Sequence, residues 1–253
     1  MQKSVIEITE ASQKIIGIDI TMNDSWIRVT EFGIQQSIII NGSPYPVPEE
    51  CQFPIIRLLN DQSFILADTR TKKNRSNLWI IDYQGKVINS FRVGDSIQDI
   101  VAFKDGIVVT YFDEAFGNFE GLDGMVFFNF KGEVNFHYSE VECYCASTID
   151  TNQLLTFFYP DFKAIVFNLR DSSHTIYESP PDIAGASAVT CFKGTPFFHG
   201  SYKDKSGVHK WNLGSKETKR IGEIPGSIRG LKNGRFLAYY QSIYSVLSIE
   251  DSD

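Results

Sequence analysis

Short apolar runs alternate with polar turns along the chain, and residues 53–94 contain the clearest example. The runs there are PIIRLL, SFILA, LWIIDY and KVINSFRV, and they are rich in β-branched and aromatic side chains. The turns NDQ and QG and one long charged loop separate them. Runs of this length with such boundaries are typical of consecutive β-hairpins. The segment therefore predicts four antiparallel strands.

The same pattern recurs at intervals of about 40 to 50 residues, which is the length of a four-stranded repeat. The first polar turn has counterparts at 10–13, 60–62, 104–106, 150–153, 193–195 and 232–234. The third runs read WIRVTE, LWIIDY, MVFFNF, AIVFNL, VHKWNL and YSVLSI, and each has a small polar residue one position before its end: Thr30, Asp82, Asn129, Asn168, Asn212 and Ser248. Such side chains accept hydrogen bonds from backbone amides two residues further on. We predict six repeats, at 1–46, 47–95, 96–140, 141–184, 185–225 and 226–253.

The stretch LWIIDYQGK, residues 78–86, resembles the third strand and following turn of blades in Trp-Asp-like and six-bladed β-propellers. This resemblance is to an architecture, not to one family. It implies an all-β protein, a single β-propeller domain over 1–253 with six blades of four antiparallel strands and an incomplete last blade. The last repeat holds only three runs. Either the last blade has three strands, or residues 4–9 serve as its outer strand and the following runs shift.

The net charge and the length of the apolar runs limit which kinds of partner and which cellular location we expect. The chain has 253 residues, 42% of them hydrophobic, with a net charge of -7 and a pI of about 5.2. An acidic field repels phosphate backbones and favours cationic partners, so we expect no nucleic-acid partner. No run approaches the roughly 20 apolar residues of a membrane span, and the first residues do not form a signal peptide. We expect a soluble, cytoplasmic protein whose four cysteines are buried, reduced thiols.

In up-and-down blades, the middle loops and blade connections share one face, and the first and third turns share the other. The loop 68–77 is basic, and its candidate residues are Arg70, Lys72, Lys73 and Arg75. The loop 113–124 is acidic, with the candidates Asp113, Glu114, Phe116, Phe119, Glu120 and Asp123. Tyr202 lies in a third loop, SYKDKSG. Loops on a rigid scaffold are the usual place for recognition, so these residues are predicted to bind a partner.

Each charged loop has several interpretations. The acidic loop could contact a partner through its two phenylalanines, bind calcium, or simply be solvated, although its spacing does not match a calcium-binding loop. The basic loop could contact phosphate or carboxylate, be a solvated tip, or pair with the acidic loop of the neighbouring blade. We expect no cofactor, with calcium as the alternative.

One further group lies on the predicted innermost strands, three residues before the first turns. Glu7 would stand between Arg57 and Arg229 if six blades close into a ring. A guanidinium presents a planar fork to carboxylate or phosphate, so the group predicts an anion site in the central channel. The alternative is a structural charge triad.

No catalytic motif is present: the four histidines lack zinc-ligand spacing, and there is no nucleophile elbow or phosphate-binding loop. The sequence therefore favours a non-enzymatic, protein-binding propeller with a basic protein partner. One version is an inhibitor or immunity protein that covers a cationic toxin. The alternatives are a metal-dependent propeller hydrolase that uses the central mouth, and a carbohydrate-binding propeller that uses Phe116 and Tyr202.

Overall fold

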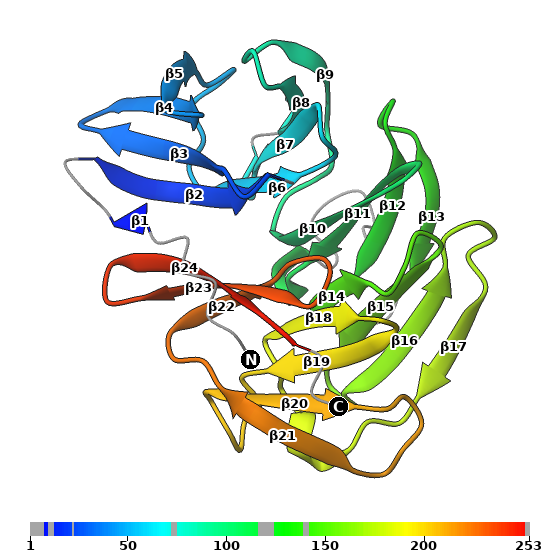
Figure 1. The fold of residues 1–253 in the computed structure, drawn as a ribbon. Helices are drawn as coiled ribbons and strands as arrows, with labels where there is room; N and C mark the ends of the chain where they lie inside the picture. Colours follow the sequence, from blue (N-terminus) through cyan, green and yellow to red (C-terminus); the bar gives the residue numbers. More distant parts are fainter. Residues whose placement is uncertain are drawn as a thin grey trace. The chain divides into compact units, whose positions relative to one another are not determined.

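A computed structural model of the protein describes residues 8–9, 13–21, 23–71, 75–115, 124–138 and 142–250 (Figure 1). The described residues form six antiparallel sheets of four strands and two short 3-10 helices. Neighbouring strands in each sheet follow one another in sequence, except at one edge of the last sheet. The predicted all-β, six-bladed propeller class is confirmed. Among the described residues, no helix has the length and hydropathy to cross a membrane.

Residues 10–140 form one compact unit with three sheets. Sheet one contains β2 (Lys14–Ile20), β3 (Trp26–Phe32), β4 (Gln35–Ile40) and β5 (Ser43–Pro46). Sheet two contains β6 (Pro54–Leu58), β7 (Ser63–Asp68), β8 (Leu78–Asp82) and β9 (Val87–Phe91). Sheet three contains β10 (Ile97–Phe103), β11 (Gly106–Tyr111), the 3-10 helix η1 (Asp113–Ala115), β12 (Met125–Asn129) and β13 (Val134–Tyr138). The first strands β2, β6 and β10 contact one another in that order.

Residues 141–253 and 1–9 form the second unit. Sheet four contains β14 (Cys143–Thr148), β15 (Gln153–Phe158), β16 (Lys163–Asn168) and β17 (His174–Tyr177), and the 3-10 helix η2 (Pro181–Ile183) follows it. Sheet five contains β18 (Ala188–Phe192), β19 (Thr195–His199), β20 (Gly207–Trp211) and β21 (Thr218–Glu223). Sheet six contains β22 (Ser227–Gly230), β23 (Arg235–Tyr240), β24 (Ile243–Ser248) and β1 (Ile8–Thr9). The single domain over the whole chain stays a prediction.

The first repeat differs from the sequence-based register. β1 pairs with β24 at the outer edge of sheet six. The three strands of the last repeat therefore gain a fourth strand from residues 8–9. Sheet one therefore begins at Lys14, and its first turn is 21–25 instead of 10–13. The run WIRVTE belongs to β3, a second strand, so Thr30 does not occupy the third-strand position assigned to it. Of the two closures considered, the shifted one is correct.

Burial follows strand order within a sheet. β7 and β11 are buried along nearly their whole length, whereas the outer strands β9, β13 and β17 are mostly exposed. β7 packs against sheet three through Ile65 and Ala67 and against sheet one through Phe64 and Leu66, so it is continuously apolar instead of alternating. Three of the six polar residues predicted at third-strand exits make the predicted bond. The Oδ1 atoms of Asp82, Asn129 and Asn168 each accept a hydrogen bond from the amide two residues on, at 2.9, 2.9 and 3.0 Å.

The four cysteines, Cys51, Cys143, Cys145 and Cys191, are all buried and free, as predicted. Burial raises the pKa of Cys51 and of Cys191 to about 12. A thiol with such a pKa carries almost no thiolate at neutral pH, so these two side chains serve as small apolar groups.

Candidate functional site

The end of each sheet that carries the middle loop is here called its loop end. In the unit of residues 10–140, the connections 47–53 and 92–96 lie at this end together with the middle loops that follow β3, β7 and β11. This placement follows from strand alternation, since every second turn of an up-and-down sheet lies at the same end. Side chains from five separate segments can therefore meet there.

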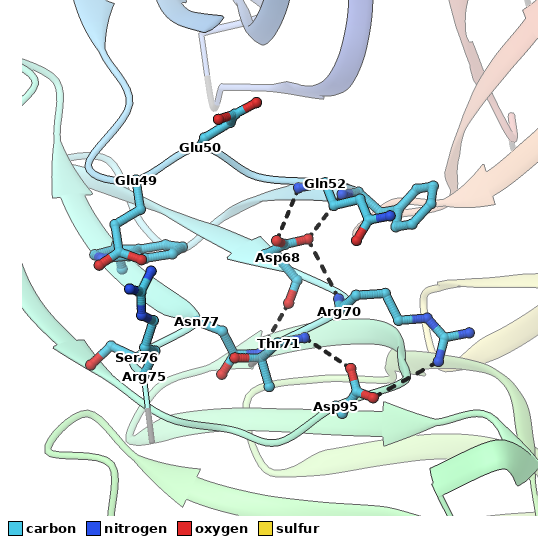
Figure 2. A pocket seen from close by; sticks show the side chains of 12 residues that line it. Glu49, Glu50, Gln52, Asp68, Arg70, Thr71, Arg75, Ser76, Asn77 and Asp95 are labelled. Atoms are coloured by element: carbon cyan, nitrogen blue, oxygen red, sulfur yellow. Dashed lines mark hydrogen bonds and ion pairs between the residues drawn. The ribbon is translucent and has the colours of Figure 1, made fainter. Parts of the chain in front are cut away.

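A cleft of about 570 Å³ opens at the loop end of sheet two (Figure 2). Its charged lining residues are Glu49, Glu50, Asp68, Arg70, Arg75 and Asp95. They come from the connection before sheet two, from the end of β7, from the middle loop and from the connection after the sheet. Four carboxylates and two guanidiniums leave the cleft with an excess of negative charge. Phe53 and Trp79 contribute apolar surface to the same cleft.

Hydrogen bonds to the backbone fix the base of the cleft. The two carboxylate oxygens of Asp68 accept from the amides of Gln52 and Phe53, both at 2.9 Å. The buried Asn77 donates to the carbonyls of Asp68 and Gly94, at 3.0 and 2.7 Å, and its Oδ1 accepts from the Val93 amide at 3.0 Å. These bonds join three segments that are distant in sequence. The base is consequently a fixed surface, which lowers the entropy cost of binding.

Arg70 connects the basic loop to the acidic one. Its guanidinium forms an ion pair with the carboxylate of Glu114 in η1 and donates to Ser96 Oγ at 2.7 Å. Asp95 Oδ2 lies 3.9 Å from Arg70 Nη1, and Asp95 Oδ1 accepts a hydrogen bond from the Thr71 amide at 2.9 Å. The hydrogen bond to Glu114 raises the pKa of Arg70 above its usual value. Pairing between neighbouring charged loops, one of the three interpretations of the basic loop, is therefore present.

Glu49 and Glu50 differ from this network because they are exposed and lie apart from Asp68 and Arg70 (Figure 2). Arg75 is also exposed, and 53% of the surface of Phe53 remains accessible. With the charge of Arg70 balanced by Glu114 and Asp95, the exposed charged groups of the cleft are Glu49, Glu50 and Arg75, two carboxylates against one guanidinium. An excess of carboxylates in a cleft that also exposes Phe53 is suited to a lysine or arginine side chain.

The structure brings only some of the predicted residues together. Arg70, Arg75 and Glu114 meet at this cleft or beside it, and Asp113 lies exposed in η1. Lys72, Lys73, Phe116, Phe119, Glu120 and Asp123 lie outside the described residues. Glu49, Glu50 and Asp95 were missed, although the predicted topology had already placed the blade connections on this face. The pair of glutamates in PVPEE was the available signal.

The structure describes only Arg57 and Arg229 of the predicted channel group, so the group itself stays a prediction. Arg57 pairs with Asp99 of β10, with Nε 2.7 Å from Oδ1, and both side chains are largely buried. Arg229 lies in β22 of the other unit, and Glu7 lies outside the described residues. The register that placed Glu7 on the first strand of sheet one is wrong, because β2 is that strand.

Tyr202 belongs to an aromatic cluster in the second unit. Its ring meets Phe162 edge-on at 5.5 Å, its hydroxyl lies 3.0 Å from that of Tyr144, and Lys205 Nζ lies over its ring at 5.0 Å. Tyr144 in turn stacks on Tyr159 at 5.7 Å. Burial, followed by the hydrogen bond to Tyr202, raises the pKa of Tyr144. The cluster joins the middle loops of sheets four and five.

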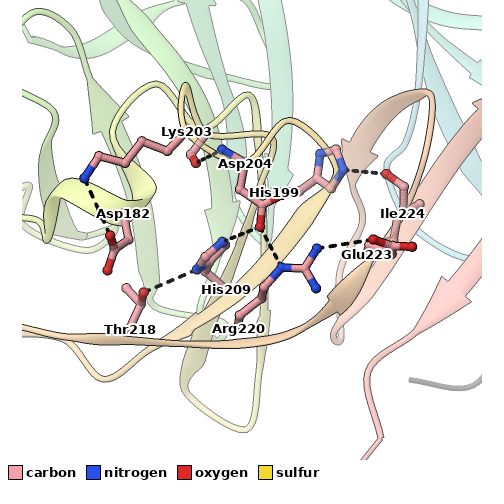
Figure 3. Close-up of polar contacts among 10 residues, drawn as sticks. Asp182, His199, Lys203, Asp204, His209, Thr218, Arg220, Glu223 and Ile224 are labelled. Atoms are coloured by element: carbon pink, nitrogen blue, oxygen red, sulfur yellow. Dashed lines mark hydrogen bonds and ion pairs between the residues drawn. The ribbon is translucent and has the colours of Figure 1, made fainter.

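A polar network joins the loop of Tyr202 to the neighbouring strands β20 and β21. Figure 3 shows the Asp204 carboxylate between His209 and Arg220, with Oδ2 at 3.2 Å from His209 Nε2 and 2.7 Å from Arg220 Nε. The hydrogen bond from Arg220 is the main cause of the lowered pKa of Asp204. Arg220 Nη2 also contacts Glu223 at 3.3 Å. The loop is thereby fixed to β20 and β21.

Exposed apolar side chains gather at the loop ends. In the unit of residues 10–140 they are Phe32 (68% exposed), Ile34 (95%), Phe53 and Phe112 (39%). In the second unit they are Tyr159, Tyr202 and Tyr240. Within the described part of the chain, the remaining large exposed apolar residues are Val87, Ile88, Val134 and Ile176 on the outer strands.

Comparison with known proteins identifies the fold but no family. No protein-family model and no curated protein matches the chain. Among solved structures, virginiamycin B lyase from Staphylococcus aureus superposes with a TM-score of 0.60 at 11% identity, over 98% of this chain and 100% of that one. The Cps50 (Swd1) β-propeller domain of Myceliophteria thermophila gives 0.59 at 11% identity, over 94% and 83%. BBS1N, solved in complex with ARL6DN, gives 0.57 at 11%, over 94% and 78%. At these identities, the likeness shows the propeller fold alone.

Proposed function

We propose that the chain is a non-enzymatic β-propeller module that binds a basic protein through the loop end of residues 10–140. The observation that carries the proposal is the charged cleft, in which Glu49 and Glu50 remain accessible while Arg70 is neutralised. A lysine or arginine of the partner would enter beside these carboxylates. The whole-chain charge of -7 would steer such a partner toward the surface.

Apolar anchors supply what charge alone does not. Aromatic side chains are enriched at protein interfaces, and Phe32, Ile34, Phe53 and Phe112 are exposed at the same end of these sheets. Single exposed apolar residues are ordinary, but a set at one end of adjacent sheets is typical of an interaction surface. An inhibitor or immunity protein that covers a cationic toxin is one cytoplasmic protein of this type. Among similar folds, BBS1N was solved in complex with another protein.

The experiment is affinity capture from native lysate at low and at moderate salt, with wild type beside Glu49→Gln/Glu50→Gln. Asp105→Asn/Glu217→Gln is the matched control, because it removes two exposed carboxylates at turns away from the cleft. We expect a stoichiometric basic partner that is lost with the cleft variant and kept by the control. An acidic partner, or equal capture by both variants, would contradict the proposal.

A further inference from the structure

A second cavity lies at the opposite end of sheet two, where the tight turns are. It has a volume of about 630 Å³ and shares no lining residue with the charged cleft. Ser63 at the start of β7 lines this cavity, and Asp68 at the end of the same strand lines the cleft. Cavities of roughly 300–1,000 Å³ are typical of sites for small molecules.

The walls of this turn-end cavity are apolar. Leu59, Ile80, Ile88 and Phe130 form them, with Phe130 contributed by the turn between β12 and β13 of sheet three. Ile80 is buried, Leu59 and Phe130 are half-buried against the core, and Ile88 is 59% exposed at the mouth. An apolar group that enters would gain contacts with all four side chains and would cover Ile88.

The polar groups of the lining hold its shape. Asn60 Oδ1 accepts from the amides of Gln62 and Ser63, both at 2.9 Å, and Asn89 Nδ2 donates to the Phe130 carbonyl at 2.7 Å. Asp82 Oδ1 accepts from the amides of Gln84 and Lys86, at 2.9 and 2.8 Å. These bonds keep the two turns fixed on either side of the opening, so the cavity is preformed.

The charge of the lining has one sign. Asp61 and Asp82 are its ionised groups, and no lysine or arginine is among the lining residues. Asp61 is exposed and takes no part in the turn-closing bonds, so its carboxylate can face a ligand. Burial, assisted by Asp19 and Asp61, raises the pKa of Tyr83 to about 12, and its hydroxyl donates to the Asn60 carbonyl at 3.1 Å. Tyr83 is therefore neutral at physiological pH.

We propose that the turn-end cavity binds a small organic cation, with an apolar body against Leu59, Ile80 and Phe130 and an ammonium group at Asp61. The carboxylate attracts the ammonium, and the apolar walls hold the body out of water. An anion of the same shape would meet two carboxylates without a compensating cation. This site is independent of the protein-binding surface.

Calorimetric titration of the full chain with three probes of similar size tests the proposal. The probes are 2-phenylethylamine, 2-phenylethanol and 3-phenylpropionate, which are a cation, a neutral molecule and an anion at neutral pH. We expect one amine per chain, bound more tightly than the alcohol, and no binding of the anion. Equal binding of amine and alcohol, or no saturable binding of the amine at millimolar concentration, would overturn it.

Two variants locate the site. Asp61→Asn should weaken amine binding by about fivefold, as expected for a lost contact between unit charges about 4 Å apart in water. Asp105→Asn, at the corresponding turn of sheet three, should leave it unchanged. Ile88→Ser should weaken both amine and alcohol, whereas Val134→Ser, at a similarly exposed outer-strand position, should weaken neither. If Asp61→Asn and Asp105→Asn bind the amine equally, the proposal is wrong, whatever the cleft variants do to partner capture.

Discussion

Gly230 of β22 lies against β18, the first strand of the neighbouring sheet. A Cβ built at this position would be 1.8 Å from the carbonyl oxygen of Val189 in β18. Contacts shorter than 3.0 Å essentially do not occur, so the strands would have to separate by at least about 1.2 Å. Such a shift would also strain the bond from the fully buried Thr190 hydroxyl to the Leu231 carbonyl. Gly230→Ala is therefore predicted to destabilise the protein.

The expected loss combines three terms. Overpacking costs about 1–3 kcal/mol, and an unsatisfied buried hydroxyl costs about 1–3 kcal/mol. Replacing glycine by alanine lowers the conformational entropy of the unfolded chain, which stabilises the folded protein by about 0.4–1 kcal/mol. We expect a net loss of about 1–5 kcal/mol, measured as a lower midpoint of urea unfolding with an unchanged slope.

Gly17→Ala provides the matched control. Gly17 in β2 also faces a neighbouring first strand, but its Cβ would lie 3.0 Å from the Pro54 carbonyl oxygen, so a shift of a few tenths of an ångström suffices. We expect a change within about 1 kcal/mol for this variant, since the mild overpacking and the restricted unfolded chain oppose each other. Equal midpoints for the two variants would refute the argument, because they differ mainly in the depth of the steric overlap.

Three further predictions concern the charged loops, a buried histidine and the thiols. Reversing Asp113, Glu114, Glu120 and Asp123 to lysine should slow association with a basic partner by orders of magnitude at low salt; unchanged association rates in a biosensor would clear this loop of a steering role. Burial lowers the pKa of His199 below its usual 6.5, and its Nε2 lies 2.8 Å from the Ile224 carbonyl. Because the unfolded chain binds the proton more readily, stability should be fully present above pH 6.5 and fall as the pH drops through 6.5 toward the folded pKa, by at most about 1.4 kcal/mol per pH unit. The midpoint of urea unfolding, measured at pH 7.5, 6.5 and 5.5, should depend less on pH in His199→Gln than in the wild type. An unaltered pH dependence would show that His199 is not its cause. Cys51 and Cys191 should resist a thiol reagent at pH 8 in the native protein and react after denaturation; rapid labelling of the native protein would show that they are accessible.

The repeat pattern was readable because each sheet repeats its turn chemistry. Asp82, Asn129 and Asn168 marked third-strand exits by a local bond to the second amide after them, which requires no knowledge of the rest of the fold. The register predicted for the first repeat was wrong for a physical reason. β3 has the buried residues Ile27, Val29 and Thr30, and third strands such as β8 are buried and apolar too, so the run of β3 resembles a third strand in composition.

The candidate site was harder to predict than the fold. Arg70 and Glu114 stood out as members of charge-rich loops, but their pairing depends on the packing of sheet two against sheet three. Glu49 and Asp95 lie in two short connections that are more than 40 residues apart in the sequence, and only the folded chain brings them to one cleft. Local sequence carries the turn chemistry, whereas the composition of a cleft is a property of tertiary packing.

Sheet six draws its strands from both sides of the unit formed by residues 10–140. During synthesis, β1 is made before the other described strands but has no partner until β24 has been made. The three sheets of residues 10–140 can each be completed in that interval. A nascent chain that stalls before β24 therefore leaves Ile8 and Thr9 without their strand partner.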